Sequence, residues 1–212
     1  MNIPALTMDK IQIIDYGQCN KGSVISAFKR LGTLFEVSHH PKEINEQIDK
    51  IILPGVSSFD TCVHALKKTG FWDYLKNPEK LENKKILGIC AGAQILFEGS
   101  EEGNEEGLGL LEGLVKKIKP GGNIKIPHLG WNRMEANPSH PKPNLLTHVN
   151  LEKRFYFSHS YHFPKSDHSL AFVDYGCQFP VIISNESVTA IQFHPEKSYS
   201  QGLQLLKNFC TI

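Results

Sequence analysis

The stretch Lys85-Ile-Leu-Gly-Ile-Cys-Ala-Gly-Ala-Gln-Ile-Leu-Phe97 is predicted to be an apolar strand that turns sharply into a helix. Gly88 and Gly92 stand two residues either side of Cys90 at this turn. Glycines there remove Cβ atoms that would collide in so tight a bend, and the side chain between them is held away from the backbone. The positive end of the following helix also favours a thiolate. The pattern predicts a nucleophilic Cys90; a buried core cysteine is the alternative.

A base and a group to orient it occur near the C-terminus, in Val188-Thr-Ala-Ile-Gln-Phe-His-Pro-Glu-Lys-Ser198. The β-branched start predicts a strand that stops at Pro195 and leaves His194 and Glu196 at its end. Cysteine catalysis requires an imidazole that takes the thiol proton and returns it to the leaving amine, with a third group fixing the ring tautomer. A solvated strand end is the alternative for this motif alone.

Strands and helices are predicted to alternate along the first half of the chain. The predicted strands are 11–15, 34–38, 51–53 and 86–89, and the predicted helices are 23–31 and 59–68. Strands separated by helices form parallel sheets with right-handed crossovers. Ligands bind at the carboxyl ends of such strands, so Pro54-Gly55, Cys90 and His194 are expected at one edge.

The second half is predicted to be richer in β-structure, with antiparallel or mixed pairing. The predicted strands are 114–119, 155–158, 170–175, 181–184 and 188–193. A surface loop is expected over 135–150, rich in Pro, Asn and His, and a closing helix over 203–209. The fold class is therefore α/β, with a mixed, mostly parallel sheet flanked by helices and additional antiparallel strands.

Composition limits the classes of function. A chain of 212 residues is predicted to form a single domain, residues 1–212. The formal net charge is +1, with basic residues scattered among acidic ones, which excludes a nucleic-acid footprint and a polybasic membrane patch. Residues 1–8 lack the pattern of a signal peptide, so a cytoplasmic protein is expected. Five cysteines without a C-x-x-C pair argue against a disulfide framework or a zinc site.

Several separated motifs resemble class I glutamine amidotransferase domains, and most closely the glutaminase subunits of imidazole glycerol phosphate synthases. Besides the two stretches quoted above, they are Ile14-Asp-Tyr-Gly17, Leu53-Pro-Gly-Val56, Ile126-Pro-His-Leu-Gly-Trp-Asn132 and Tyr156-Phe-Ser-His-Ser-Tyr161. The resemblance runs nearly end to end and implies a flavodoxin-like amidotransferase fold. It also implies that Cys90 attacks the side-chain amide of glutamine, that His194 is base then acid, and that Glu196 orients the imidazole.

The resemblance assigns substrate-binding positions as well. A glycine lets the backbone turn an N–H toward a developing oxyanion, and a strand-ending turn is the alternative reading of Pro54-Gly55-Val56. By resemblance, backbone groups near Gly55 and Val56 and the N–H of Ala91 hold the oxyanion. Gln94 binds the amino-acid end of glutamine through its side chain, or is a solvated helix residue. Backbone groups of the strand segment Ser158, His159 and Ser160 contact the same end.

Three positions depart from the family pattern. Ser57 stands where the family usually has a second glycine, and a non-glycine residue resists the positive φ that a peptide flip at the oxyanion turn requires. Ala91 and Ala93 replace larger apolar residues, a change expected to alter packing more than chemistry.

His159 and His162 suggest a metal, but no carboxylate or thiolate accompanies them at ligand spacing, so neither metal nor cofactor is expected.

A partner subunit is also implied by the resemblance. Trp131 and Asn132 lie in a loop that the family uses at its synthase interface, and Lys197 is similarly placed. Trp is a frequent interface anchor, and a buried core Trp is the alternative. The implied partner is a (β/α)8 cyclase that forms a heterodimer with the glutaminase and receives its ammonia through an internal channel.

Three functions remain open at this level. The first is the glutaminase of histidine biosynthesis, which supplies ammonia for imidazole glycerol phosphate synthesis. The second is a paralogous glutaminase that serves another synthase, such as a surface-sugar amidination system, as the substitutions at Ser57, Ala91 and Ala93 allow. The third is a non-catalytic regulatory subunit, which the complete set of Cys90 and its partners disfavours.

Overall fold

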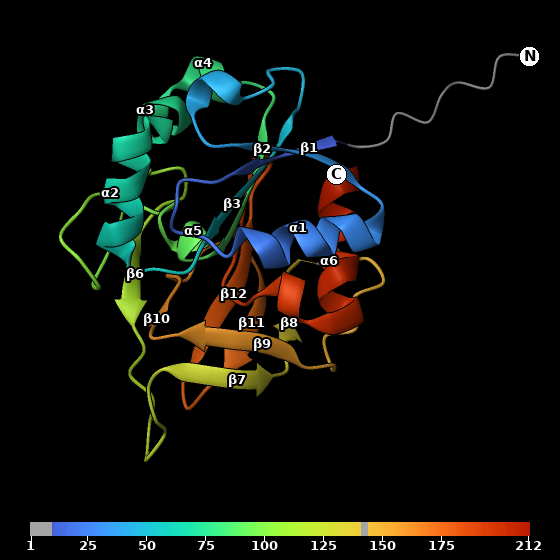
Figure 1. The fold of residues 1–212 in the computed structure, drawn as a ribbon. Coiled ribbons are helices and arrows are strands. Elements are labelled where there is room, and N and C mark those ends of the chain that lie inside the picture. The colour runs from blue at the N-terminus through green and yellow to red at the C-terminus, as the bar shows by residue number, and fades with distance from the viewer. Residues whose placement is uncertain (1–9, 141–143) are drawn as a thin grey trace, which may run out of the picture.

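A central sheet with helices on both faces organises the chain (Figure 1). The computed structural model describes residues 10–140 and 144–212. The sheet has eight strands in the order β2-β1-β3-β4-β13-β12-β11-β8. The expectation about a signal peptide concerns residues outside the described part. None of the helices in the described part is long and apolar enough to cross a membrane.

The parallel half of the sheet confirms the predicted alternation. Its strands are β1 (Lys10–Ile14), β2 (Leu34–Ser38), β3 (Lys50–Gly55), β4 (Lys85–Cys90) and β13 (Val188–Ile191). The connecting segments are α1 (Lys21–Leu31), η1 (Pro41–Glu43), α2 (Phe59–Thr69), α3 (Phe71–Lys76) and α4 (Pro78–Leu81). Helix α1 ends at Gly32, whose left-handed φ of 70° closes the last turn.

Strand β3 is longer than predicted, because it continues through Pro54 and Gly55 instead of stopping there. Strand β1 pairs with β3 only as far as Ile52, whereas β4 pairs with β3 to its end. Pro54 therefore lies where one side of the strand is unpaired, and its missing N–H leaves no ladder bond unmade.

The antiparallel half continues the same sheet beyond β13. Its strands are β12 (Gln178–Ser184), β11 (Ser169–Asp174) and β8 (Glu135–Ala136). The expected loop over 135–150 thus contains β8 and a short helix, η2 (Asn144–Leu146), and its Leu145 is buried in the core. An apolar residue at that position is what anchors the segment instead of leaving it on the surface.

Two small sheets lie beside the main one. One contains β10 (Tyr161–His162), β6 (Leu114–Lys117) and β5 (Gly99–Ser100), and the other contains β7 (His128–Asn132) and β9 (Phe155–His159). The segment expected as an interface loop around Trp131 is therefore a strand, because its backbone pairs with β9 from His128 to Asn132. The chain closes with η3 (Pro195–Lys197) and α6 (Tyr199–Thr211).

The core is divided by the sheet into two apolar layers. On β3, Ile52 points into the layer under α1 and α6, whereas Ile51 and Leu53 point into the layer under α2 and α3. This alternation follows from the two-residue period of a strand. Helices α1 and α6 lie side by side on one face, as Figure 1 shows. Coverage of both faces leaves the strand ends as the place for a ligand.

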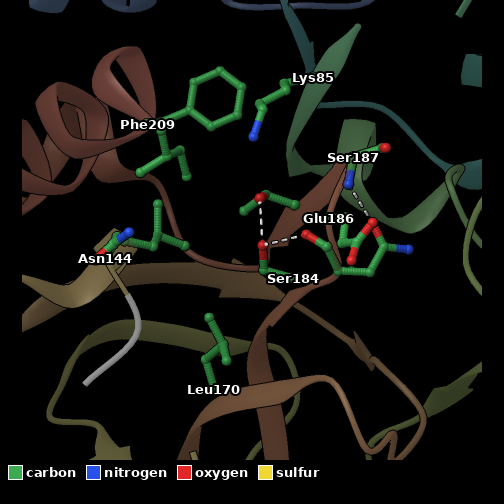
Figure 2. A pocket seen from close by; sticks show the side chains of 11 residues that line it. Lys85, Asn144, Leu170, Ser184, Glu186, Ser187 and Phe209 are labelled. Carbon is green, nitrogen blue, oxygen red and sulfur yellow. Dashed lines mark hydrogen bonds between the residues drawn. The ribbon is translucent and has the colours of Figure 1, made fainter. Parts of the chain in front are cut away.

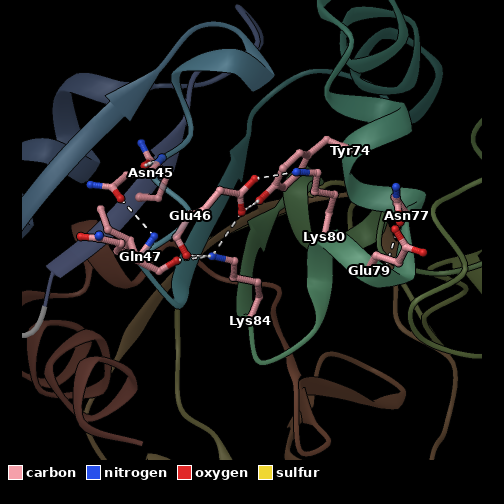
Figure 3. Close-up of polar contacts among 10 residues, drawn as sticks. Asn45, Glu46, Gln47, Tyr74, Asn77, Glu79, Lys80 and Lys84 are labelled. Carbon is pink, nitrogen blue, oxygen red and sulfur yellow. Dashed lines mark hydrogen bonds and ion pairs between the residues drawn. The ribbon is translucent and has the colours of Figure 1, made fainter.

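A polar cluster holds the segment before β3 against α3 and α4 (Figure 3). The buried Lys84 ammonium donates to the carbonyl oxygens of Glu46 at 2.7 Å and Ile48 at 2.8 Å. The Glu46 carboxylate in turn accepts from Lys80 at 2.9 Å and from the hydroxyl of Tyr74 at 3.3 Å. Burying the Lys84 charge is tolerated because carbonyl dipoles and the Glu46 carboxylate surround it.

A cavity of about 250 Å³ lies at the amino end of β4, beside the turn between β12 and β13 (Figure 2). Lys85, Ser184 and Phe209 are among its lining residues. Cys90 terminates the opposite end of β4, so this cavity is separated from Cys90 by the length of the strand.

Candidate active site

The turn that carries Cys90 has the strained geometry of a nucleophile elbow. Cys90 ends β4 with φ 55° and ψ −116°, a conformation that L-residues rarely adopt. A Cβ on Gly92 would come 2.0 Å from the carbonyl oxygen of Leu53, and one on Gly88 would come 2.6 Å from Ala93 Cα. Only glycine fits at these two positions, so the structure explains the Gly-x-Cys-x-Gly pattern sterically.

The helix predicted after Cys90 is shorter than expected, because α5 is the single turn Ala91–Gln94. The next carbonyl oxygens, of Ile95 and Leu96, accept hydrogen bonds from the N–H groups of Leu108 and Leu110. The 107–111 segment therefore satisfies the backbone that a longer helix would have used.

His194 and Glu196 lie at the same edge as Cys90, as predicted. His194 Nδ1 is 2.8 Å from Glu196 Oε1, and both side chains are nearly inaccessible, with 5% and 2% exposed. The imidazole is close enough to Cys90 to interact with its thiol electrostatically. Strand β13 ends at Ile191, three residues before His194, and the His194 backbone is instead held by its N–H bond to the Tyr156 carbonyl at 2.9 Å.

Contacts with Cys90 and Glu196 determine the charge of His194. Burial lowers the pKa of His194, but hydrogen bonds and charge interactions with Cys90 and Glu196 outweigh it and raise the pKa to about 10. At neutral pH the ring is an imidazolium that lies between a sulfur and a carboxylate. A positive charge beside the sulfur stabilises the nucleophilic thiolate.

Cys90 opens onto a polar pocket of about 230 Å³. Besides Cys90, the residues expected to bind substrate that line it are Val56, Ala91, Gln94, Ser158, His159 and Ser160. Gly55 lies behind the pocket wall, paired with Cys90 in the sheet. Ser57, Ser58, Glu102, Pro127 and Tyr161 complete the lining. The carbonyl oxygen of Ser158 is 3.9 Å from Cys90 Sγ, so β9 forms the wall facing the nucleophile.

Two hydrogen bonds tie the oxyanion turn to Gln18. The N–H of Val56 donates to the Gln18 carbonyl oxygen at 3.0 Å, and Ser57 Oγ donates to Gln18 Oε1 at 2.6 Å. The Val56 N–H that the sequence suggested for the oxyanion is therefore already engaged. Gln18 carried no sequence signal, because the contact joins residues 39 positions apart.

Gln94 is a buried pocket residue, which excludes the solvated alternative. Its Nε2 donates to the Tyr161 carbonyl at 3.1 Å and to Gln192 Oε1 at 2.9 Å. Both amide protons are thereby used within the protein. The oxygen of Gln94 is the part of its amide that remains for a ligand, so this side chain offers an acceptor.

Glu102 is a pocket residue that sequence reasoning missed. One of its oxygens, Oε2, accepts from the Phe59 N–H at 2.8 Å. Burial raises the pKa of Glu102, and the Phe59 hydrogen bond opposes that shift. Glu102 lies in a run of acidic residues, Glu101-Glu-Gly-Asn-Glu-Glu106, which resembles an ordinary solvated loop. Tertiary folding alone brings this carboxylate to the pocket.

His159 and His128 form a buried imidazole pair behind the pocket. His128 Nδ1 and His159 Nε2 are 3.1 Å apart, and His159 Nδ1 donates to the Tyr161 carbonyl at 2.7 Å. Burial lowers the pKa of His159 to about 3 and that of His128 to about 4, so both rings are neutral. The side chain of His159 therefore fixes β9 against β7.

Two of the residues expected at a partner interface, Trp131 and Lys197, both pack against the ring of Tyr156. Trp131 is 39% exposed and stacks on Tyr199 with ring centroids 4.9 Å apart. Lys197 is exposed, with its ammonium 5.5 Å from the centroid of the Tyr156 ring, and Asn132 donates to the Asp174 carbonyl at 3.0 Å. The exposure of Trp131 disfavours the core alternative.

Comparisons with known proteins extend over nearly the whole chain. The family profile "Glutamine amidotransferase class-I" matches residues 12–212. The chain is 42% identical over 206 residues to "Imidazole glycerol phosphate synthase subunit HisH" of Acinetobacter baylyi, covering 95% of this chain and 98% of that protein. It is 40% identical over 204 residues to "Imidazole glycerol phosphate synthase subunit HisH 2" of Pseudomonas aeruginosa, covering 95% and 99%.

Solved structures match the fold at lower identity. A "Crystal structure of glutamine amidotransferase" superposes with a TM-score of 0.72 at 20% identity, covering 95% of this chain and 99% of that chain. "Structure of PurLQS from Thermotoga maritima" gives a TM-score of 0.70 at 19% identity, covering 96% and 98%. The sheet, the elbow and the profile agree, and this chain belongs to the class I glutamine amidotransferase family.

Proposed function

We propose that this chain is the glutaminase subunit of an imidazole glycerol phosphate synthase, which hydrolyses glutamine and delivers ammonia for histidine biosynthesis. The near-full-length identity of 40% or more to two proteins of that name supports the pathway. One observation carries the activity, which is the strained turn that presents Cys90 at the sheet edge where Glu196 holds the His194 ring at 2.8 Å. The profile spans 12–212, which supports a single amidotransferase domain.

The reaction follows from the charges at the site. The Cys90 thiolate attacks the amide carbon of the glutamine side chain and forms a tetrahedral oxyanion. His194 donates its proton to the nitrogen, so the C–N bond breaks, ammonia leaves and a glutamyl thioester remains. His194 then removes a proton from water, whose oxygen attacks the thioester carbon. Glutamate leaves when the C–S bond breaks and the thiolate is restored. Glu196 keeps the ring oriented through both steps.

The oxyanion is held by the backbone. The N–H of Ala91, directly after the nucleophile, is one donor. A second donor requires rotation of the peptide between Gly55 and Val56, because the Val56 N–H bonds Gln18 in this conformation. Removal of one oxyanion donor typically lowers the rate by about 10²- to 10³-fold, so this conformation is expected to turn glutamine over slowly.

The ammonium end of glutamine is bound by acceptors. Gln94 offers an oxygen, and Glu102 has one carboxylate oxygen that the Phe59 N–H leaves free. Backbone groups of Ser158, His159 and Ser160 contact the amino-acid end from the opposite wall. An amino acid with a neutral amide side chain fits this polar pocket of about 230 Å³.

The partner is a (β/α)8 cyclase in the cytoplasm, bound at the surface formed by Trp131, Asn132 and Lys197. An exposed tryptophan stacked on a second aromatic ring has the character of an interface anchor. Ammonia must reach the acceptor before it is protonated or lost to water, which favours a docked heterodimer with an internal channel. In this heterodimer the cyclase subunit catalyses the lyase step.

Glutamate release from glutamine tests this proposal. It is measured for the purified chain alone and with the cyclase and its nucleotide ligand, with Cys90→Ala as the control. Release that requires Cys90 and rises with the liganded cyclase is the expected result. Release that ignores the cyclase would assign the chain to another acceptor, and no release under any condition would contradict the glutaminase activity.

Docking is tested separately with Trp131→Ala, which is expected to weaken binding of the cyclase by about 2 kcal/mol. The matched control is Trp72→Ala, which removes an indole from α3 on a different part of the surface. Equal effects of the two substitutions on cyclase affinity would contradict the assigned interface.

A further inference from the structure

We infer that Gln192 is a positioning residue that sets the polarity of the Gln94 amide and so selects substrates that carry an α-ammonium group. The inference rests on the proposed glutaminase function. Gln192 follows β13 and precedes His194 by two residues. It has no exposed surface, so it acts through Gln94 and not on the substrate.

The amide of Gln94 is held in one orientation by two acceptors. Its Nε2 donates one proton to the Tyr161 carbonyl at 3.1 Å and the other to Gln192 Oε1 at 2.9 Å. A half-turn of the amide would place the Gln94 oxygen against both of these oxygens, which is electrostatically unfavourable. The oxygen therefore faces the pocket, where an N–H would repel an ammonium group.

In the described part of the chain, the amide of Gln192 has a hydrogen-bonded oxygen and an unsatisfied nitrogen. Its Nε2 is buried and bonds no group within the described residues. A buried donor without an acceptor is destabilising, so the packing around Gln192 satisfies its oxygen and leaves its nitrogen unsatisfied. Among residues 10–140 and 144–212, the Gln192 side chain makes one hydrogen bond, the bond to Gln94.

The loss of the Gln192 acceptor has a specific consequence. One N–H of Gln94 would then be buried without a partner, and the side chain would turn toward the pocket to satisfy it. Glutamine would lose an acceptor for its ammonium, whereas a glutamine analogue without the α-amino group would lose nothing. A positioning role for Gln192 therefore predicts a change in the preference for glutamine over its des-amino analogue. A purely structural role would leave that preference unchanged.

The test uses binding, so that it does not depend on turnover. Dissociation constants of L-glutamine and of glutaramate, its des-amino analogue, are measured by calorimetry in the Cys90→Ala background. Gln192→Met removes the acceptor at similar side-chain length. This variant is expected to raise the dissociation constant of L-glutamine by about tenfold and to change that of glutaramate by less than about twofold. Gln192→Glu keeps an oxygen acceptor and is expected to restore most of the preference.

The alternative outcomes separate the two proposals. Equal weakening of both ligands by Gln192→Met, or no change for either, would overturn the positioning role while the glutaminase function stands. Failure of the Cys90→Ala protein with native Gln192 to bind L-glutamine would overturn the assigned substrate and the positioning role together. Thermal unfolding of each variant shows whether any loss of affinity follows from loss of the fold.

Discussion

Gly55 and Cys90 are directly paired at the ends of the adjacent parallel strands β3 and β4. The nucleophile and the oxyanion turn are therefore held together by sheet register rather than by side-chain contacts. A Cβ on Gly55 would come 2.3 Å from the N of Gly92 and 2.8 Å from the hydroxyl of Tyr16. The close approach of the two strand ends thus depends on the absence of a side chain at Gly55.

Gly55→Ala is expected to disrupt the site and the fold together. Its methyl group collides with the backbone of the elbow, so we expect a loss of about 3 kcal/mol of unfolding free energy and of glutaminase activity. Gly22→Ala is the matched control, because its Cβ would have no atom nearer than 3.9 Å and lies in α1. Denaturant unfolding measures both, and similar stabilities would contradict the steric role of Gly55.

Ser57→Gly is expected to raise the glutaminase rate of the chain without its partner by about tenfold. The substitution removes the hydrogen bond from Ser57 Oγ to Gln18 and admits positive φ at the oxyanion turn. Ser57→Ala removes the same bond but keeps a Cβ, so a smaller rise separates the two contributions. Unchanged glutamate release in both variants would show that Gln18 does not restrain the turn.

His194 is expected to make stability depend on pH. Its pKa in the folded protein is raised to about 10 from an ordinary value of 6.5. The stabilisation is complete below about pH 6.5 and is lost as pH rises through 10, with a slope of at most about 1.4 kcal/mol per pH unit.

Unfolding free energies of the native protein and His194→Gln, measured from pH 6 to 10, test this dependence. The advantage of the native protein is expected to shrink as the pH rises, and less steeply in a Cys90→Ala background. A difference that grows with pH would contradict a raised pKa for His194.

Glu102→Gln is expected to raise KM for glutamine by about tenfold and to change kcat little, because it removes charge and not the bond to Phe59. Since burial raises the pKa of Glu102, affinity in the native enzyme should fall as pH decreases through that raised pKa. This acid-side loss should disappear in the variant. Glu101→Gln, an exposed neighbour, is the control, and a matching KM increase there would exclude a specific role for Glu102.

Much of the scaffold was predictable from local sequence. The glycines around Cys90 predicted the elbow, because only a residue without Cβ fits within 3 Å of the facing backbone. The alternation of apolar strands and helices predicted the parallel sheet. His194 follows a β-branched strand, and parallel strands place their carboxyl ends at one edge of a sheet. The sequence therefore correctly predicted that His194 lies at the same sheet edge as Cys90.

The sequence by itself indicated Cys90, His194 and Glu196 as candidate site residues and predicted the α/β architecture, because each inference depends on residues near one another in sequence. Only the tertiary structure decided that Glu102 reaches the pocket, that Gln18 engages Val56 and that Gln94 is locked by Gln192. These contacts join segments that no periodicity connects, and their geometry depends on how the sheet and its loops pack. Burial then sets the charge of each group, as the neutral His159 and the protonated His194 illustrate.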